Sequence, residues 1–173
     1  MDALTTQPRK YGLHATLKAP FRLIGTQGDL ETAVSDIANR LRPVWPGNLK
    51  LTRIGSFLAL VPQGDQTALN DMAGQIVAFL DPFRATLTED EVARRNPDRL
   101  TDRQRDLLDR WGYPYVMEEF RFHITLTGPC DLAPEALEPR ILPVLPDPFG
   151  IEEICLMGED DDGMFHLIRR FPL

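Results

Sequence analysis

The sequence predicts an α+β fold, with short strands and helices alternating along one domain that covers residues 1–173. The element patterns run in the order β-α-ββ-α, a helical insertion, and β-(α)-ββ, which is typical of α+β and split-βαβ folds. Apolar residues make up 43% of the chain and charged residues 26%, which excludes a disordered chain. At 173 residues, the chain is long enough to bury a sizeable core without disulfides or metal ions.

The first half of the chain predicts a strand, a helix, a pair of strands and a second helix, at residues 11–20, 29–42, 49–61 and 65–80. Apolar side chains recur at helical spacing in both predicted helices. Asp29 is the expected N-cap of the first helix, and Pro43 stops it. Gly55 divides the pair of strands, so we expect a hairpin or a bulged strand there.

Residues 81–118 are predicted to form a helical insertion of mixed charge. Two capping boxes, at 88–91 and 101–104, predict two short helices, and Gly112 fits the end of the second. A second strand of the same kind as the first is expected at 119–129, followed by a weakly helical segment. The chain then closes with a predicted hairpin that turns at Asp162-Gly163.

Charge and composition limit the partners and the compartment. The net charge of −7 argues against a protein that binds duplex nucleic acid through a broad basic surface. No apolar run is long enough to cross a membrane, and the polar start of the chain does not resemble a signal peptide. Two cysteines without metal-ligand spacing predict neither a disulfide scaffold nor a zinc site. We therefore expect a cytoplasmic protein without a metal or other cofactor.

One internal repeat contains the candidate functional residues. Residues 14–20 read HATLKAP and residues 123–129 read HITLTGP, so four of the seven positions are identical. The chain has three histidines, and two of them, His14 and His123, open this repeat. Two similar strands would share Thr, Leu and Pro through composition alone, but composition does not explain the aligned histidines. We therefore interpret the repeat as part of a functional site.

Strand geometry separates each repeat into two faces, because successive side chains point to opposite sides. One face of each predicted strand is apolar and is expected to lie under helices. The other faces are polar and contain no carboxylate, which suits a groove that binds an anion; they consist of Gly12, His14, Thr16 and Lys18 on the first strand and Arg121, His123, Thr125 and Thr127 on the second.

These side chains fit the hydrolysis of a phosphodiester. One imidazole takes the proton of the attacking water and the other protonates the leaving oxygen. Hydroxyl groups of Thr16 and Thr125 donate to the non-bridging oxygens, while Lys18 and Arg121 balance the charge that develops on them. No acidic cluster is available to hold a divalent ion, so a metal-free route is expected. Tyr113 and Tyr115 are candidate substrate contacts, with packing at the rim as the alternative, and the third histidine, His166, is expected to be structural.

Paired H-x-T-L segments more than a hundred residues apart resemble the signature of the two-histidine (2H) phosphoesterases. The chain is most similar to the branch encoded in phosphonate-utilisation operons, over residues 11–21, 57–62, 81–129 and 169–173. This resemblance implies a bilobal, pseudo-symmetric fold with two antiparallel sheets around a central cleft and helices outside. It also implies that His14, Thr16, His123 and Thr125 are the catalytic residues. Members of that branch begin with an extra strand, so we expect either a truncated chain or a sheet that lacks this strand.

The function implied is metal-independent hydrolysis of a cyclic phosphodiester, such as a ribose cyclic phosphate, within phosphonate metabolism. Two alternatives remain open. One is a non-catalytic module that binds a phosphometabolite or an RNA end in the same cleft, and the other is an RNA 2′,3′-cyclic phosphodiesterase. The paired histidines favour an enzyme over a binding module, because binding alone can use Arg and Lys. The acidic net charge favours a small metabolite over RNA.

Overall fold

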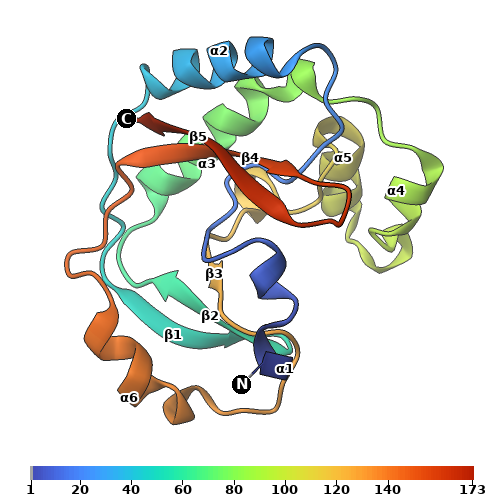
Figure 1. The fold of residues 1–173 in the computed structure, drawn as a ribbon. Coiled ribbons are helices and arrows are strands. Elements are labelled where there is room, and N and C mark those ends of the chain that lie inside the picture. Colours follow the sequence, from blue (N-terminus) through green and yellow to red (C-terminus); the bar gives the residue numbers. More distant parts are fainter. Residues whose placement is uncertain (1) are drawn as a thin grey trace.

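The computed structural model describes residues 2–173, with side chains from residue 4 onward, and it has the predicted α+β architecture. Its strands form two small antiparallel sheets (Figure 1). The first sheet has the order β1 (Leu49–Ile54), β2 (Phe57–Pro62) and β3 (Ile124–Thr125). The second is the hairpin of β4 (Glu153–Glu159) and β5 (Phe165–Pro172). Both hairpins lie where the sequence predicts them, around Gly55 and Gly163, each with a positive φ.

Two long helices form a core with the second sheet. α2 (Gln27–Ala38) and α3 (Thr67–Phe79) bury their apolar faces together with Ile154 of β4 and Phe171 of β5. The N-cap of α2 lies three residues before the predicted one. Its N-cap is Thr26, and Asp29 is the third helical residue of a capping box whose side chain contacts the Thr26 backbone N–H. The prediction that Asp29 is the N-cap is therefore wrong: Thr and Asp both fit a cap, and in the structure the Thr26 side chain accepts from the Asp29 backbone N–H.

A second core lies on one face of the first sheet. Leu58 and Leu60 of β2 are buried there with two leucines of β1. The segment after β3 covers them with short helical turns instead of one regular helix, as expected for a Pro-interrupted stretch: η5 (Pro134–Ala136), α6 (Glu138–Ile141) and η6 (Leu142–Val144).

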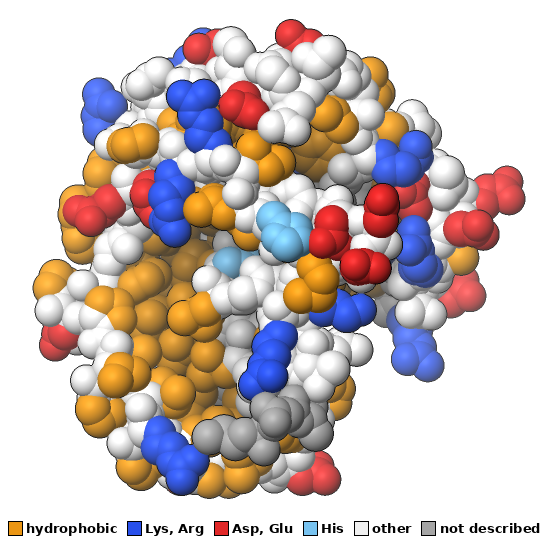
Figure 2. Space-filling view, viewed as in Figure 1, with side chains coloured by type: hydrophobic (Ala, Val, Ile, Leu, Met, Phe, Trp, Pro, Cys, Tyr) orange, Lys and Arg blue, Asp and Glu red, His pale blue; other side chains and the backbone are white. Residues whose placement is uncertain are grey.

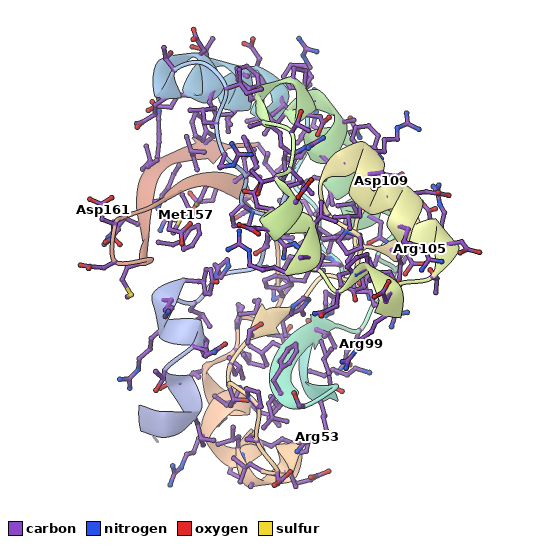
Figure 3. The ribbon with its side chains drawn as sticks, turned by 90° about the vertical axis from the view of Figure 1, so that its right-hand side faces the viewer. Arg53, Arg99, Arg105, Asp109, Met157 and Asp161 are labelled. Carbon is purple, nitrogen blue, oxygen red and sulfur yellow. The ribbon has the colours of Figure 1, made fainter. Side chains whose placement is uncertain are left out.

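The helical insertion forms a third small core against α3. Its two helices, α4 (Glu89–Ala93) and α5 (Asp102–Trp111), begin with the two predicted capping boxes, and Gly112 ends α5 with a φ of 74°. Single-turn helices precede them, η2 (Asp81–Phe83) and η3 (Pro97–Arg99). In Figure 3 Arg105 and Asp109 of α5 lie at the opposite edge of the molecule from Asp161 at the tip of the β4–β5 hairpin. The insertion and the tip of the hairpin therefore lie on opposite sides of the molecule.

The two predicted motif strands are much shorter than expected. Within 11–20 the chain forms one bridge, at Ala15, and within 119–129 the regular strand is β3 alone. A single-turn helix precedes each of them: η1 (Pro8–Lys10), which follows α1 (Asp2–Thr5), and η4 (Met117–Glu119). The left-handed Gly12 breaks the first strand, and it leaves Leu13 77% exposed. The prediction that Leu13 lies under a helix is therefore wrong.

No helix among the described residues is long and apolar enough to cross a membrane.

Two glycines with positive φ provide a matched pair for a stability measurement. A Cβ at Gly47 would lie 2.6 Å from the backbone nitrogen of Gly64, whereas a Cβ at Gly55 has no atom within 4 Å. Both substitutions to alanine carry the cost of a left-handed residue, about 1–2 kcal/mol. We expect Gly47→Ala to lose roughly 1–3 kcal/mol more, because backbone must shift to admit the methyl group. Urea unfolding of both variants measures this difference, and equal losses would contradict the close approach at Gly47.

Candidate active site

The site is built on the pairing between the two halves of the internal repeat. Ala15 forms an antiparallel bridge with Ile124, and Ile124 also pairs with Leu60 of β2. The first sheet therefore continues beyond β3 to the segment around Ala15. The residues at the centre of the two H-x-T triplets lie directly opposite each other.

This register brings the four predicted catalytic residues onto one face. In an antiparallel pair, residues that flank a bridge face each other and point to the same side. His14 is therefore opposite Thr125, and Thr16 is opposite His123. Ile124 points to the other side, where it packs against the buried leucines of the first sheet. The apolar centre of each triplet anchors it to the core while the histidine and threonine stay on the open face.

Both histidines make the same contact with their own backbone. Nδ1 of His14 lies 3.2 Å from the carbonyl oxygen of Gly12, and Nδ1 of His123 lies 2.8 Å from that of Arg121. A carbonyl oxygen only accepts hydrogen bonds, so each Nδ1 carries a proton and donates it. In the neutral imidazole Nε2 is then the basic nitrogen. Nε2 of His14 lies 3.1 Å from Oγ1 of Thr16, within the same triplet.

An aromatic ring lies beside each imidazole. Tyr11 stacks on His14 with ring centroids 5.6 Å apart, and Phe57 of β2 is tilted against His123 at 5.9 Å. The sequence analysis did not single out either ring. Tyr11 was detectable as the aromatic residue that flanks the first repeat, but nothing in the sequence connects Phe57 with His123.

The catalytic candidates are open to solvent. Thr16 is exposed, and His14, His123 and Thr125 are partly buried. Figure 2 shows a histidine side chain at the margin of a hollow in the surface, apart from a second histidine beside the acidic tip of the hairpin. A small solute therefore reaches imidazole and hydroxyl groups without unfolding of the chain.

Two predicted members of the polar faces lie elsewhere. The ammonium group of Lys18 donates to the carbonyl oxygen of Val77 at 3.1 Å and lies 3.6 Å from a carboxylate oxygen of Asp81, with its side chain 9% exposed. Burial lowers the pKa of Lys18, against the opposing effect of Asp81. Thr127 is also buried, and its hydroxyl accepts a hydrogen bond from the Leu58 backbone N–H at 3.0 Å. The prediction that Thr127 lines the groove is therefore wrong, because strand alternation ends after Thr125.

The remaining predicted substrate contacts are spread over two places. Arg121 is exposed two residues before His123, on the predicted polar face. Tyr113 packs into the core between α3 and α5, where burial raises its pKa, and Arg95 lies over its ring. Tyr115, 47% exposed, meets Tyr113 edge-on. The two tyrosines therefore belong to the insertion side of the molecule, and their contact with a substrate stays a prediction.

His166 has a structural partner at the tip of the β4–β5 hairpin. Its Nε2 lies 2.6 Å from a carboxylate oxygen of Asp160, whose other oxygen accepts from the backbone N–H groups of Asp162 and Met164. These hydrogen bonds, the one from Met164 first, lower the pKa of Asp160. Among the described residues, no group of three or more His, Cys, Asp or Glu side chains is arranged to hold a metal ion.

Comparison with known proteins places the chain in a family. A family described as "Protein of unknown function (DUF1045)" matches residues 16–166. The chain belongs to the DUF1045 family. Two curated relatives are both named "Ribose 1,5-bisphosphate phosphokinase PhnN". One, from Janthinobacterium sp. (strain Marseille), is 40% identical over 131 residues, and the other, from Laribacter hongkongensis (strain HLHK9), is 36% identical over 124 residues.

These matches cover 73% and 70% of this chain but 28% of each relative, so the DUF1045 chain corresponds to less than a third of either protein. No solved structure matches the chain.

The backbone contacts of the two histidines predict their tautomers. We expect the neutral forms of both His14 and His123 to carry the proton on Nδ1, because each Nδ1 faces a carbonyl oxygen. Nitrogen-15 NMR of the imidazole groups measures this, with signals assigned from His14→Gln and His123→Gln. Finding the neutral proton on Nε2 in either residue would contradict the geometry.

Proposed function

We propose that the chain is a phosphoric diester hydrolase of the two-histidine type, with His14 and His123 as its acid–base pair. The observation that carries this proposal is the bridge between Ala15 and Ile124, which opposes the two H-x-T triplets and puts their histidines and threonines on one face. Both imidazoles are held through Nδ1, which leaves Nε2 as the nitrogen for proton transfer, and in His14 this nitrogen lies 3.1 Å from Oγ1 of Thr16. Hydrolysis needs one group that accepts a proton and one that donates a proton, and the two Nε2 atoms can fill these two roles.

The hydrolysis follows from these groups. The neutral Nε2 of one histidine takes a proton from water as the water oxygen bonds to phosphorus. The Nε2–H of the other histidine gives its proton to the sugar oxygen as the phosphorus–oxygen bond of the ring breaks. Hydroxyl groups of Thr16 and Thr125 donate to the non-bridging oxygens, on which negative charge increases. The products are a phosphate monoester and a free hydroxyl group, and the next turnover begins once the two histidines exchange a proton with solvent.

The proposed substrate class is a cyclic phosphodiester of ribose, and the proposed pathway is phosphonate metabolism. Both relatives, which contain a segment similar to this chain, are named for ribose 1,5-bisphosphate. Opening a cyclic phosphate on a phosphorylated ribose yields a ribose bisphosphate, the class of compound in that name. The net charge of −7 favours a small anion over RNA. The kinase activity in the name belongs to proteins of which this chain matches 28%.

Removing either imidazole tests the proposal. We expect His14→Ala and His123→Ala each to lower kcat by roughly 10²–10⁴-fold, the usual contribution of a general acid or base. The assay is hydrolysis of cyclic phosphodiesters of ribose and of nucleotides, with EDTA present. A panel that includes RNA ends with a 2′,3′-cyclic phosphate separates the small-metabolite enzyme from an RNA-processing enzyme.

The third histidine provides the matched control. His166→Gln removes an imidazole whose partner is Asp160 at the hairpin tip, so this variant should retain the activity of the parent protein. Near-normal turnover in either His14→Ala or His123→Ala would falsify the paired mechanism. Binding of the cyclic compounds without turnover in the parent protein would identify a binding module instead, and activity lost in EDTA and restored by one metal ion would contradict a metal-free route.

The threonine hydroxyls should contribute less than the imidazoles. We expect Thr16→Val and Thr125→Val to lower kcat/KM by roughly 10–100-fold, as for the loss of a hydrogen bond to a charged group. Thr16→Ser and Thr125→Ser keep the hydroxyl group and should retain most of the activity. Equal losses in the Val and Ser variants would show that the methyl group, and not the hydroxyl, is what the site requires.

A further inference from the structure

Tyr11 connects the first histidine with the C-terminal hairpin. Its ring stacks on the imidazole of His14, with an interplanar angle of 30°, and on the ring of Phe165 in β5, at 4.8 Å and 29°. Figures 1 and 3, seen from directions 90° apart, both show the N-terminal segment directly beside the hairpin. The contact therefore joins segments that lie more than 150 residues apart in the sequence.

The local backbone makes this stack possible. η1 ends at Lys10 with Tyr11 as its C-cap, and Gly12 then adopts a φ of 68°. A Cβ at Gly12 would have open space around it, so the left-handed backbone, not crowding, is what requires glycine. This turn returns the chain so that Gly12 presents its carbonyl oxygen to Nδ1 of His14 while Tyr11 covers the ring.

The two histidines differ in how firmly their segments are held. His123 directly precedes β3, which pairs with β2 on one side and with Ala15 on the other. The segment of His14 is at the edge of the sheet and has the single bridge at Ala15. The orientation of His14 therefore depends more on side-chain contacts than that of His123 does, and Tyr11 and Phe165 supply the ring contacts.

We propose that Tyr11, supported by the ring of Phe165 in β5, is a positioning residue for His14. This inference rests on the proposed function for its catalytic consequence. Tyr11 transfers no proton in this scheme. Its ring restricts rotation of the imidazole, so that Nε2 of His14 stays on the open face with Thr16 and His123.

The test compares removal of the ring with removal of the hydroxyl group. Tyr11→Leu and Phe165→Leu should lower kcat by roughly three- to tenfold, the usual contribution of an aromatic pair, with KM within about twofold of the parent value. Tyr11→Phe keeps the stack and should restore kcat to within about twofold of the parent. In proton NMR spectra, the carbon-bound imidazole protons of His14 should move downfield in Tyr11→Leu, because they lose the ring current of Tyr11, and should stay in place in Tyr11→Phe.

The two measurements separate this inference from the proposed function. Unchanged imidazole signals in Tyr11→Leu would overturn the stack whether or not the protein is an enzyme. A downfield shift with unchanged kcat would overturn the positioning role, as would an equal loss of kcat in Tyr11→Phe and Tyr11→Leu. If Tyr11→Leu does not fold, Phe165→Leu tests the effect on kcat from the other side of the stack, with Tyr11→Phe as its control. A parent protein that hydrolyses none of the cyclic phosphodiesters refutes the proposed function, while the NMR comparison still decides the stack.

Discussion

The site depends on one antiparallel bridge, between Ala15 and Ile124. A bridge of this kind fixes which residues oppose each other and which face they share, so one backbone pairing places four side chains at once. A shift of one residue in this pairing would put one histidine and one threonine on the core side. The pairing is protected from such a shift because Ile124 packs against buried leucines of the first sheet and also pairs with Leu60. The polar face can stay open to solvent because the apolar face supplies the stability.

The two halves of the repeat are similar in sequence but are held differently. The second half adjoins β3, inside the sheet, and Phe57 of the neighbouring strand lies against His123. The first half of the repeat lies at the edge of the sheet, and side-chain contacts of Tyr11 and Lys18 hold its two ends. Tyr11 reaches the C-terminal hairpin, and Lys18 reaches the C-terminal turn of α3, where the carbonyl oxygen of Val77 and the carboxylate of Asp81 compensate for the burial of its ammonium group. Lys18 therefore acts as an anchor of the first motif in this structure, which accounts for a cation at that position without a direct contact with phosphate.

The surroundings of the site divide into surfaces of different character. The hairpin tip is acidic, with Asp160 organised by its own backbone contacts and by His166. The insertion carries mixed charges, and besides its core contact with α3 it forms an ion pair between Glu91 and Arg22, which lowers the pKa of Glu91 to about 2. Neither surface offers the broad positive field that binds a polynucleotide. The paired triplets place imidazole and hydroxyl groups on one face of the first sheet, and the function proposed for them is to bind a small anion.

The sequence by itself determined the features that depend on local rules. Capping boxes at Thr88 and Thr101, the turn at Gly55 and the closing hairpin all follow from the hydrogen bonds and backbone angles of neighbouring residues. The repeat also gave His14 and His123 as candidate site residues, because two aligned H-x-T triplets can be found without knowledge of contacts. Only the tertiary structure decided how much of each motif is strand, because a strand forms only where another strand pairs with it. Here the pairing is limited to Ala15 in the first motif and to β3 in the second. The tertiary structure also placed Lys18 and Thr127, which strand alternation had assigned to the groove. Lys18 instead donates to a carbonyl oxygen of α3, and Thr127 accepts from the backbone N–H of Leu58. The rings of Phe57 and Phe165 beside the site come from distant segments, and no local pattern predicts contacts that form only when the chain closes on itself.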